Sequence, residues 1–169
     1  YFFQNNKKTI ETILYKYMII TVIILLLTEV VSSVVIYYVD SYALKSITSR
    51  IHWYTGIIWF YLLYFYSIAF ISDIQVDSFK EYVFLNKRTK IMTIFSIIVS
   101  IGYFFFPFNK LDKISYLPGP ASYYILSYCI ISILCVVIYT ITYGKTIDIR
   151  KRMAIYAQVI GLTLVLALQ

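Results

Sequence analysis

Residues 18–27 read MIITVIILLL and residues 57–65 read IIWFYLLYF, and these two stretches decide the fold class. Each belongs to a run of about twenty apolar residues, the length that a helix needs to cross a hydrocarbon core about 30 Å thick. In hydrocarbon every backbone amide must be paired within the chain, which leaves helices and closed barrels as the alternatives. Barrel strands alternate polar and apolar residues, and these stretches do not. The sequence therefore predicts an all-α, polytopic bundle of transmembrane helices.

The composition agrees with a membrane protein. Of the 169 residues, 61% are hydrophobic and 14% are charged, and the mean hydropathy is +0.78. A water-soluble domain of this length needs a larger polar share to cover its surface. We therefore expect residues 1–169 to form one transmembrane domain whose principal partner is the lipid bilayer.

Periodic apolar runs predict about five membrane-spanning helices, over residues 9–39, 51–72, 91–106, 122–143 and 153–169. The expected connectors are a polar segment at 40–50, a charged segment at 73–90, a loop up to residue 121, and a basic linker at 144–152. Nine aromatic residues between Trp53 and Phe70 are spread around the whole second helix. Aromatic side chains in that distribution fill the space between helices and anchor at membrane interfaces.

The chain begins at Tyr1 and stops at Gln169 inside an apolar run. We therefore expect a fragment of a longer protein. If residues 1–3 close an earlier span and another helix follows Gln169, the parent has seven helices, with an external N-terminus and a cytoplasmic C-terminus.

The formal charge is +7, which in a soluble protein would suggest a nucleic-acid partner. Here the cations lie in short clusters between apolar runs, where they set membrane orientation instead. On one side of the membrane we count eleven Lys and Arg residues, which lie before or at the start of the first helix, in the 73–90 connector and in the 144–152 linker. Four lie on the opposite side: Lys45, Arg50, Lys110 and Lys113. We expect the richer side, with Tyr1, to be cytoplasmic in a bacterial cell membrane, and we expect no nucleic-acid partner.

Glu29 is the acid that lies deepest in an apolar run, and the neighbouring polar residues Thr28, Ser32 and Ser33 extend a stripe along the same helix. A buried carboxylate is costly unless it is paired or neutral, so we expect Glu29 to face the bundle interior. The stripe either contacts a ligand and responds to protons or cations, or makes interhelical hydrogen bonds that fix packing.

His52, the single histidine, is expected at the outer start of the second helix. It is an interface residue or an external pH-responsive group. One histidine does not assemble a metal site, and no nucleophile–base pair surrounds it.

Two further candidate positions come from spacing. Gln158 and Gln169 are eleven residues apart, which returns to nearly the same face of a helix, so that face should look into the bundle. The Pro118-Gly119-Pro120 segment is either a stiff corner between two helices or the frame of an external binding mouth.

The sequence contains no phosphate-binding glycine loop, no metal-ligand cluster and no Ser/His/Asp constellation. Cys129 and Cys135 lie six residues apart in one apolar run, about 120° from each other around a helix, which favours free buried thiols. We therefore expect no catalytic residue, no metal and no cofactor in this chain.

One region has a familiar pattern. Tyr116-Leu117-Pro118-Gly119-Pro120 is followed by a tyrosine-rich helix, a basic linker ending in Lys151-Arg152, and a helix closing on Gln169. This arrangement resembles the N-terminal multi-helix sensor domains of bacterial signalling proteins. The first helix is similar too, through residues Asn5, Asn6, Lys7, Lys8, Glu11, Tyr15 and Glu29.

The resemblance implies a sensory input domain that passes a membrane or extracellular cue to a cytoplasmic histidine kinase or GGDEF-type diguanylate cyclase, with a homodimeric parent and an unknown ligand. His52 would not be the phosphoacceptor of a kinase, because it lies on the wrong side of the membrane. The alternatives are a small multi-pass transporter gated by Glu29 or a subunit of a membrane enzyme.

Overall fold

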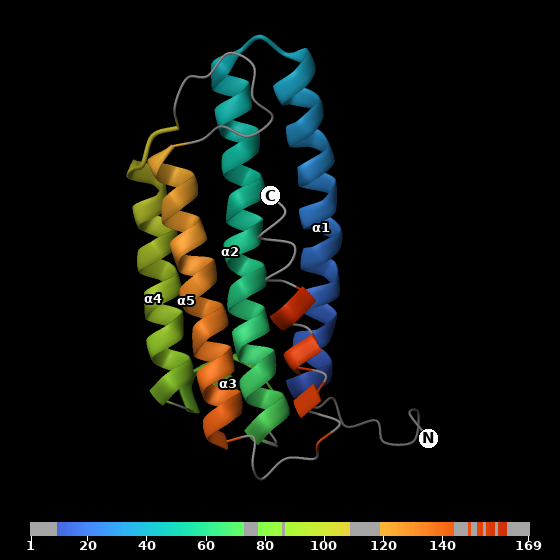
Figure 1. The fold of residues 1–169 in the computed structure, drawn as a ribbon, viewed down its shortest axis with the longest axis vertical. Coiled ribbons are helices and arrows are strands. Elements are labelled where there is room, and N and C mark those ends of the chain that lie inside the picture. The colour runs from blue at the N-terminus through green and yellow to red at the C-terminus, as the bar shows by residue number, and fades with distance from the viewer. Residues whose placement is uncertain are drawn as a thin grey trace.

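The computed structural model describes residues 10–72, 78–85, 87–108 and 119–143, and further along the chain residues 149, 152–153, 155–157 and 159–161. Its helices are α1 (Ile10–Tyr38), α2 (Tyr42–Ser72), α3 (Phe79–Leu85), α4 (Lys87–Phe105) and α5 (Pro120–Tyr143). The four long helices run side by side along the long axis of the molecule, and α3 lies at one end (Figure 1). Since each of these elements is helical, the predicted all-α bundle is confirmed for the described residues.

Four helices in the described part of the chain, namely α1, α2, α4 and α5, are long and apolar enough to cross a membrane. The 29 residues of α1 extend for about 43 Å at 1.5 Å per residue, which exceeds a hydrocarbon core of about 30 Å. The predicted fifth span, 153–169, is described only at residues 153, 155–157 and 159–161. These are helical, and Ile155 and Val159 are buried.

The predicted polar connector at 40–50 is wrong over most of its length, because α2 already begins at Tyr42. Ser41 starts the helix: its carbonyl accepts a hydrogen bond from the Lys45 amide at 3.1 Å, and its hydroxyl accepts one from the Leu44 amide at 3.5 Å. Thr48 donates its hydroxyl to the carbonyls of Leu44 and Lys45, so a polar residue is accommodated within the helix. The turn between α1 and α2 is therefore only residues 39–41.

The predicted 73–90 connector also contains structure, since α3 lies within it and α4 begins at Lys87 rather than at residue 91. Ser78 caps α3 by accepting the Glu81 amide at 3.2 Å. The side chain of Tyr82 is fully buried and donates to the carbonyl of Phe65 at 3.1 Å. Thr89 donates to the carbonyl of Val83 at 2.9 Å, which joins α3 to the first turn of α4.

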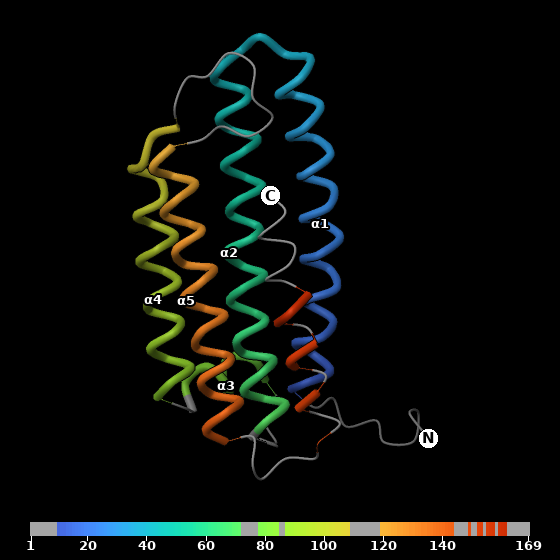
Figure 2. The backbone as a smooth tube through the Cα atoms, viewed as in Figure 1, coloured from blue at the N-terminus to red at the C-terminus, as the bar shows by residue number. Residues whose placement is uncertain are grey.

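Helix α2 is the centre of the bundle, with neighbours α1, α4 and α5, whereas α1 packs mainly on α2 and also meets α3. Figure 2 shows that α1 and α2 extend beyond the ends of α4 and α5 on the side of the α1–α2 turn. This central position explains why aromatic residues surround α2. A helix that is apolar on every side is covered by neighbouring helices or faces lipid, and α2 does both, since Trp59 and Phe65 are buried whereas Ile51 and Ile58 are about half exposed.

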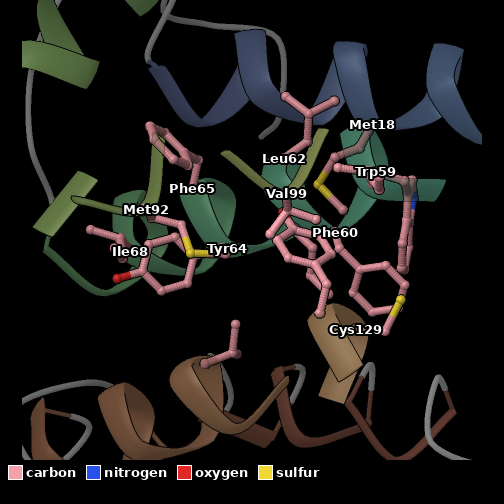
Figure 3. Packing of buried hydrophobic residues seen from close by; sticks show 14 of the residues in the cluster. Met18, Trp59, Phe60, Leu62, Tyr64, Phe65, Ile68, Met92, Val99 and Cys129 are labelled. Atoms are coloured by element: carbon pink, nitrogen blue, oxygen red, sulfur yellow. The ribbon is translucent and has the colours of Figure 1, made fainter. Parts of the chain in front are cut away.

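The core of the bundle draws side chains from all four long helices. Figure 3 shows Met18 of α1, Val99 of α4 and Cys129 of α5 around the rings of Trp59 and Phe60 of α2. The ring centroids of Trp59 and Phe60 are 5.2 Å apart and nearly perpendicular, the edge-to-face arrangement that aromatic pairs favour. Both cysteines are free thiols, as their spacing predicts.

The outer surface of the bundle is apolar. On α1 the exposed side chains include Leu26, Leu27 and Val30, each about three-fifths accessible. Exposed isoleucines follow one another along α4 and α5 in the same way, for example Ile98 and Ile138. Apolar patches of this extent are not left in water by monomeric soluble proteins, and they match the solvation offered by lipid tails.

Arg50 of α2 binds the C-terminal end of α4. Its guanidinium donates to the carbonyl of Tyr103 at 3.0 Å and to the carbonyl of Phe106 at 2.8 Å, and it lies 5.0 Å from the ring centroid of Phe108. The last carbonyls of a helix have no partner within it, and the negative end of the helix dipole attracts a cation. Tyr42 adds a hydrogen bond to the carbonyl of Phe108 at 2.9 Å.

We predict that Arg50→Gln lowers the free energy of unfolding by about 1.5–3 kcal/mol, the usual size of hydrogen bonds to a charged group. Arg50→Lys should recover only part of the loss, because an ammonium does not reproduce the two-pronged contact. The measurement is denaturant unfolding in detergent micelles followed by circular dichroism, with Lys45→Gln as the control. Equal stability of Arg50→Gln and the control would contradict the capping role.

Candidate functional site: a polar cluster between the first two helices

The candidate site is a polar cluster in the half of the α1–α2 interface that is nearer to the turn. It consists of Thr28, Glu29 and Ser32 from α1 with Ser49 and His52 from α2. Glu29 is nine residues before the end of α1 at Tyr38, so it lies about 13 Å along the helix axis from that end. Toward the N-terminal end of α1 the buried side chains are mainly apolar and include Ile10, Leu14 and Met18.

Glu29 and His52 form the centre of this cluster. The carboxylate oxygen Oε2 of Glu29 lies 2.9 Å from Nε2 of His52, and the two side chains are 30% and 11% exposed. The other ring nitrogen, Nδ1, lies 3.3 Å from the hydroxyl of Thr28. Both ring nitrogens of His52 therefore face a polar atom of α1, which fixes the plane of the imidazole between the two helices.

The Thr28 hydroxyl donates its hydrogen to the carbonyl of Leu25 at 2.9 Å. The Thr28 oxygen and Nδ1 of His52 also lie within hydrogen-bond distance, and which of the two donates depends on the tautomer of the ring. The contact between Oε2 and Nε2 joins a carboxyl group of α1 to an imidazole of α2.

Two serines extend the cluster toward the turn. The hydroxyls of Ser32 and Ser49 lie 3.4 Å apart, and both side chains are buried. Their bond is long for two hydroxyls, so it adds less than the ion pair does. Ser33 is half-buried and lies about 100° further round α1 than Ser32, outside the line of the cluster.

The other predicted positions lie elsewhere. Gly119 is buried just before α5, and its carbonyl accepts hydrogen bonds from the amides of Ser122 and Tyr123 at 3.1 and 3.3 Å. Since Pro120 then occupies the first helical position, this segment acts as the start of α5. Pro118, Gln158 and Gln169 lie outside the described residues.

The contact between Glu29 and His52 was not predicted from either residue alone. Their distances from the turn along the sequence could have predicted it: the turn is centred on Asp40, and Glu29 and His52 lie eleven residues before it and twelve after it. Ser32 and Ser49 are similarly placed, as are Tyr15 and Tyr66, whose ring centroids are 6.3 Å apart. Antiparallel helices joined by a short turn bring such equidistant residues together.

The site supplies two side chains of the kind that bind metals, but no group of three His, Cys, Asp or Glu side chains forms among the described residues. The arrangement therefore supports hydrogen bonding between α1 and α2. No protein-family model, no curated protein and no solved structure matches the chain.

We predict that Glu29 and His52 are energetically coupled. In a double-mutant cycle of Glu29→Ala and His52→Ala, the interaction energy should be about 0.5–3 kcal/mol, as found for residues in direct contact. The free energies of unfolding would be measured in detergent micelles.

Glu11→Ala combined with His52→Ala is the matched control, because Glu11 lies at the other end of α1. Its effects should add to within about 0.5 kcal/mol. A Glu29–His52 cycle that is additive to the same extent would show that the pair does not hold the helices together.

Proposed function

We propose that this chain is the transmembrane input domain of a bacterial signal-transduction protein, in which a membrane or extracellular cue changes the packing of α1 on α2. In this proposal the bundle has about five spans, lies in the bacterial cell membrane with its Tyr1 end in the cytoplasm, and acts on a cytoplasmic histidine kinase or diguanylate cyclase in a dimeric parent.

The observation that supports this function best is the polar cluster centred on Glu29 and His52. Apolar contacts loosen gradually, whereas a short polar contact inside a helix interface is favourable only when its two groups meet, because a separated polar group there has lost water and gained no partner. A cue that bonds to either side chain therefore favours one of two packings. An element with two such states is what a signalling domain requires.

The attachment of α1 suits such a movement. Its inner half packs through Ile10, Leu14 and Met18, and the ring of Tyr17 lies 6.3 Å from that of Phe79 in α3. If the polar half separates, α1 tilts about these apolar contacts and displaces α3. The signal would then reach the end of the bundle where α3 lies (Figure 1).

The distribution of the cations supports the proposed orientation. The end of the bundle with α3 has Lys80, Lys87 and Lys90 exposed, whereas at the opposite end Lys45 is half-buried and Arg50 is bound to the carbonyls of α4. Free cations are retained on the cytoplasmic side of a membrane. We therefore place α3 in the cytoplasm and the α1–α2 turn outside.

Labelling of single cysteines tests this topology. With Cys129 and Cys135 replaced by serine, Lys45→Cys and Asp112→Cys should react with an impermeant maleimide added to intact cells, and Leu85→Cys should react only after the cells are opened. Labelling of positions 45 and 85 from the same side would contradict the topology.

Signal output tests the function itself. The chain fused through Gln169 to a diguanylate cyclase domain should give a cyclase activity that is regulated by the bundle. In Glu29→Gln or His52→Asn this activity should no longer be regulated. The exchange Glu29→His with His52→Glu should restore regulation, because the pair re-forms. Ser33→Ala, outside the cluster, is the control. Unchanged regulation in both cluster variants would contradict the proposal.

A transporter is the second candidate, because a carboxylate paired with histidine is a common element of proton-coupled carriers. In that case Glu29→Gln would abolish uptake of a substrate by cells or vesicles. The other acids of the described residues, Glu11, Asp40 and Glu81, lie at helix ends or in the turn, so the described part of the chain provides no second protonatable acid at depth. For this reason we favour the sensor.

The coding sequence after Gln169 gives an additional check: an effector domain is expected there, and an early stop codon would contradict it.

A further inference from the structure

A groove runs between α2 and α4 on the membrane-facing side of the bundle. Its volume is about 480 Å³, and its walls include Tyr54 and Tyr61 of α2 with Thr93, Ile97 and Ile101 of α4. This volume falls within the range of about 300–1,000 Å³ that small-molecule sites occupy.

Four of the five polar side chains in the groove walls have hydrogen-bond partners within the bundle. Tyr61 and Thr93 share a hydroxyl–hydroxyl bond of 3.1 Å, and Tyr54 donates to the carbonyl of Ser100 at 3.2 Å. The hydroxyl of Ser96 lies 2.9 Å from that of Tyr128 in α5. Apart from Ser100, the lining is then isoleucine and the faces of tyrosine rings, which fit an apolar chain.

Helix α3 lies near the end of the groove that is marked by Tyr61 and Thr93. The ring of Phe79 lies 6.5 Å from that of Tyr61, and Nζ of Lys90 lies 5.9 Å from the centroid of Phe84. Lys90 precedes Thr93 and Ile97 by three and seven residues, so it lies on the same face of α4 as the groove.

This end of the groove is positively charged. Lys80, Lys87 and Lys90 are exposed there, and Glu81 is the one acid among the described residues 78–85 and 87–90. Arg88 points the other way: its guanidinium donates to the hydroxyl of Tyr143 and lies 5.4 Å from the ring centroid of Tyr139 in α5. The cations near the groove are therefore lysines that the described structure leaves accessible to an anion.

We propose that an anionic phospholipid of the cytoplasmic leaflet occupies this site, with an acyl chain in the α2–α4 groove and its phosphate at Lys90. An apolar groove that ends in exposed lysines at the membrane surface is complementary to such a molecule in both shape and charge. The proposal requires the membrane topology but not the signalling role, so each of the two is tested separately.

The test is native mass spectrometry of the full chain in detergent, titrated with phosphatidylglycerol or with phosphatidylcholine of the same acyl chains. Phosphatidylglycerol should bind at least about fivefold more tightly, as expected for about 1 kcal/mol per lysine near the surface. Lys90→Gln should remove most of that preference. Lys16→Gln, an exposed lysine of α1, should leave it unchanged.

Filling the groove tests the acyl chain. Ile97 and Ile98 are neighbours with similar exposure, 53% and 59%, but only Ile97 lines the groove. Ile97→Trp should weaken phosphatidylglycerol binding about tenfold or more, and Ile98→Trp should not. Ile101→Trp provides a second groove variant if Ile97→Trp loses its helical circular dichroism.

Three results would overturn the proposal. The first is equal affinity for the two lipids, which would mean ordinary solvation by the bilayer. The second is equal binding by properly folded groove and control variants. The third is a lipid-free dimer whose formation Ile97→Trp or Ile101→Trp prevents, which would make a second copy of the chain the occupant.

Discussion

The constraint on which this structure depends is that hydrocarbon offers no hydrogen bonds, so every polar group at membrane depth needs a partner within the protein. Several hydroxyls meet this requirement locally, for example those of Thr21 and Thr140, which donate to the carbonyls four residues earlier in their own helices. The buried hydroxyls of Tyr103 and Ser132 are exceptions among the described residues. Ionisable groups need more. Glu29 obtains its partner from another helix, and this requirement sets the position of α1 against α2.

Helix α2 provides polar side chains on two opposite faces, and each binds a polar group of a neighbouring helix. His52 binds α1 through Glu29, and Arg50, two residues earlier, binds the last carbonyls of α4. Two residues along a helix correspond to a rotation of about 200°, which explains why Arg50 and His52 bind different helices. The half of α2 nearer to the α1–α2 turn thereby connects α1 to α4.

The long apolar helices could be predicted from the sequence because hydropathy and length are properties of each segment alone. Hydropathy did not identify the helical residues 42–50 or α3, because these segments contain many polar residues. Some of these polar side chains cap or bond the helix backbone, as Ser41, Thr48 and Ser78 do. Glu29 and His52 were both identified as candidates, but their contact depends on the register of two helices and therefore on where the turn lies. The groove beside α4 depends on packing between α2 and α4, for which no single segment contains a signal.

The central claim is that lipid tails solvate the outer face of this bundle, and nitroxide labels on α1 test it most directly. Labels at positions 26, 27 and 30, placed one at a time in protein reconstituted into vesicles, report contact with oxygen, which concentrates in hydrocarbon, and with a nickel chelate, which stays in water. We predict high oxygen and low nickel accessibility at all three positions, since Leu26, Leu27 and Val30 are exposed on the surface of α1. High nickel accessibility there, or a folded monomer in buffer without detergent, would contradict the account.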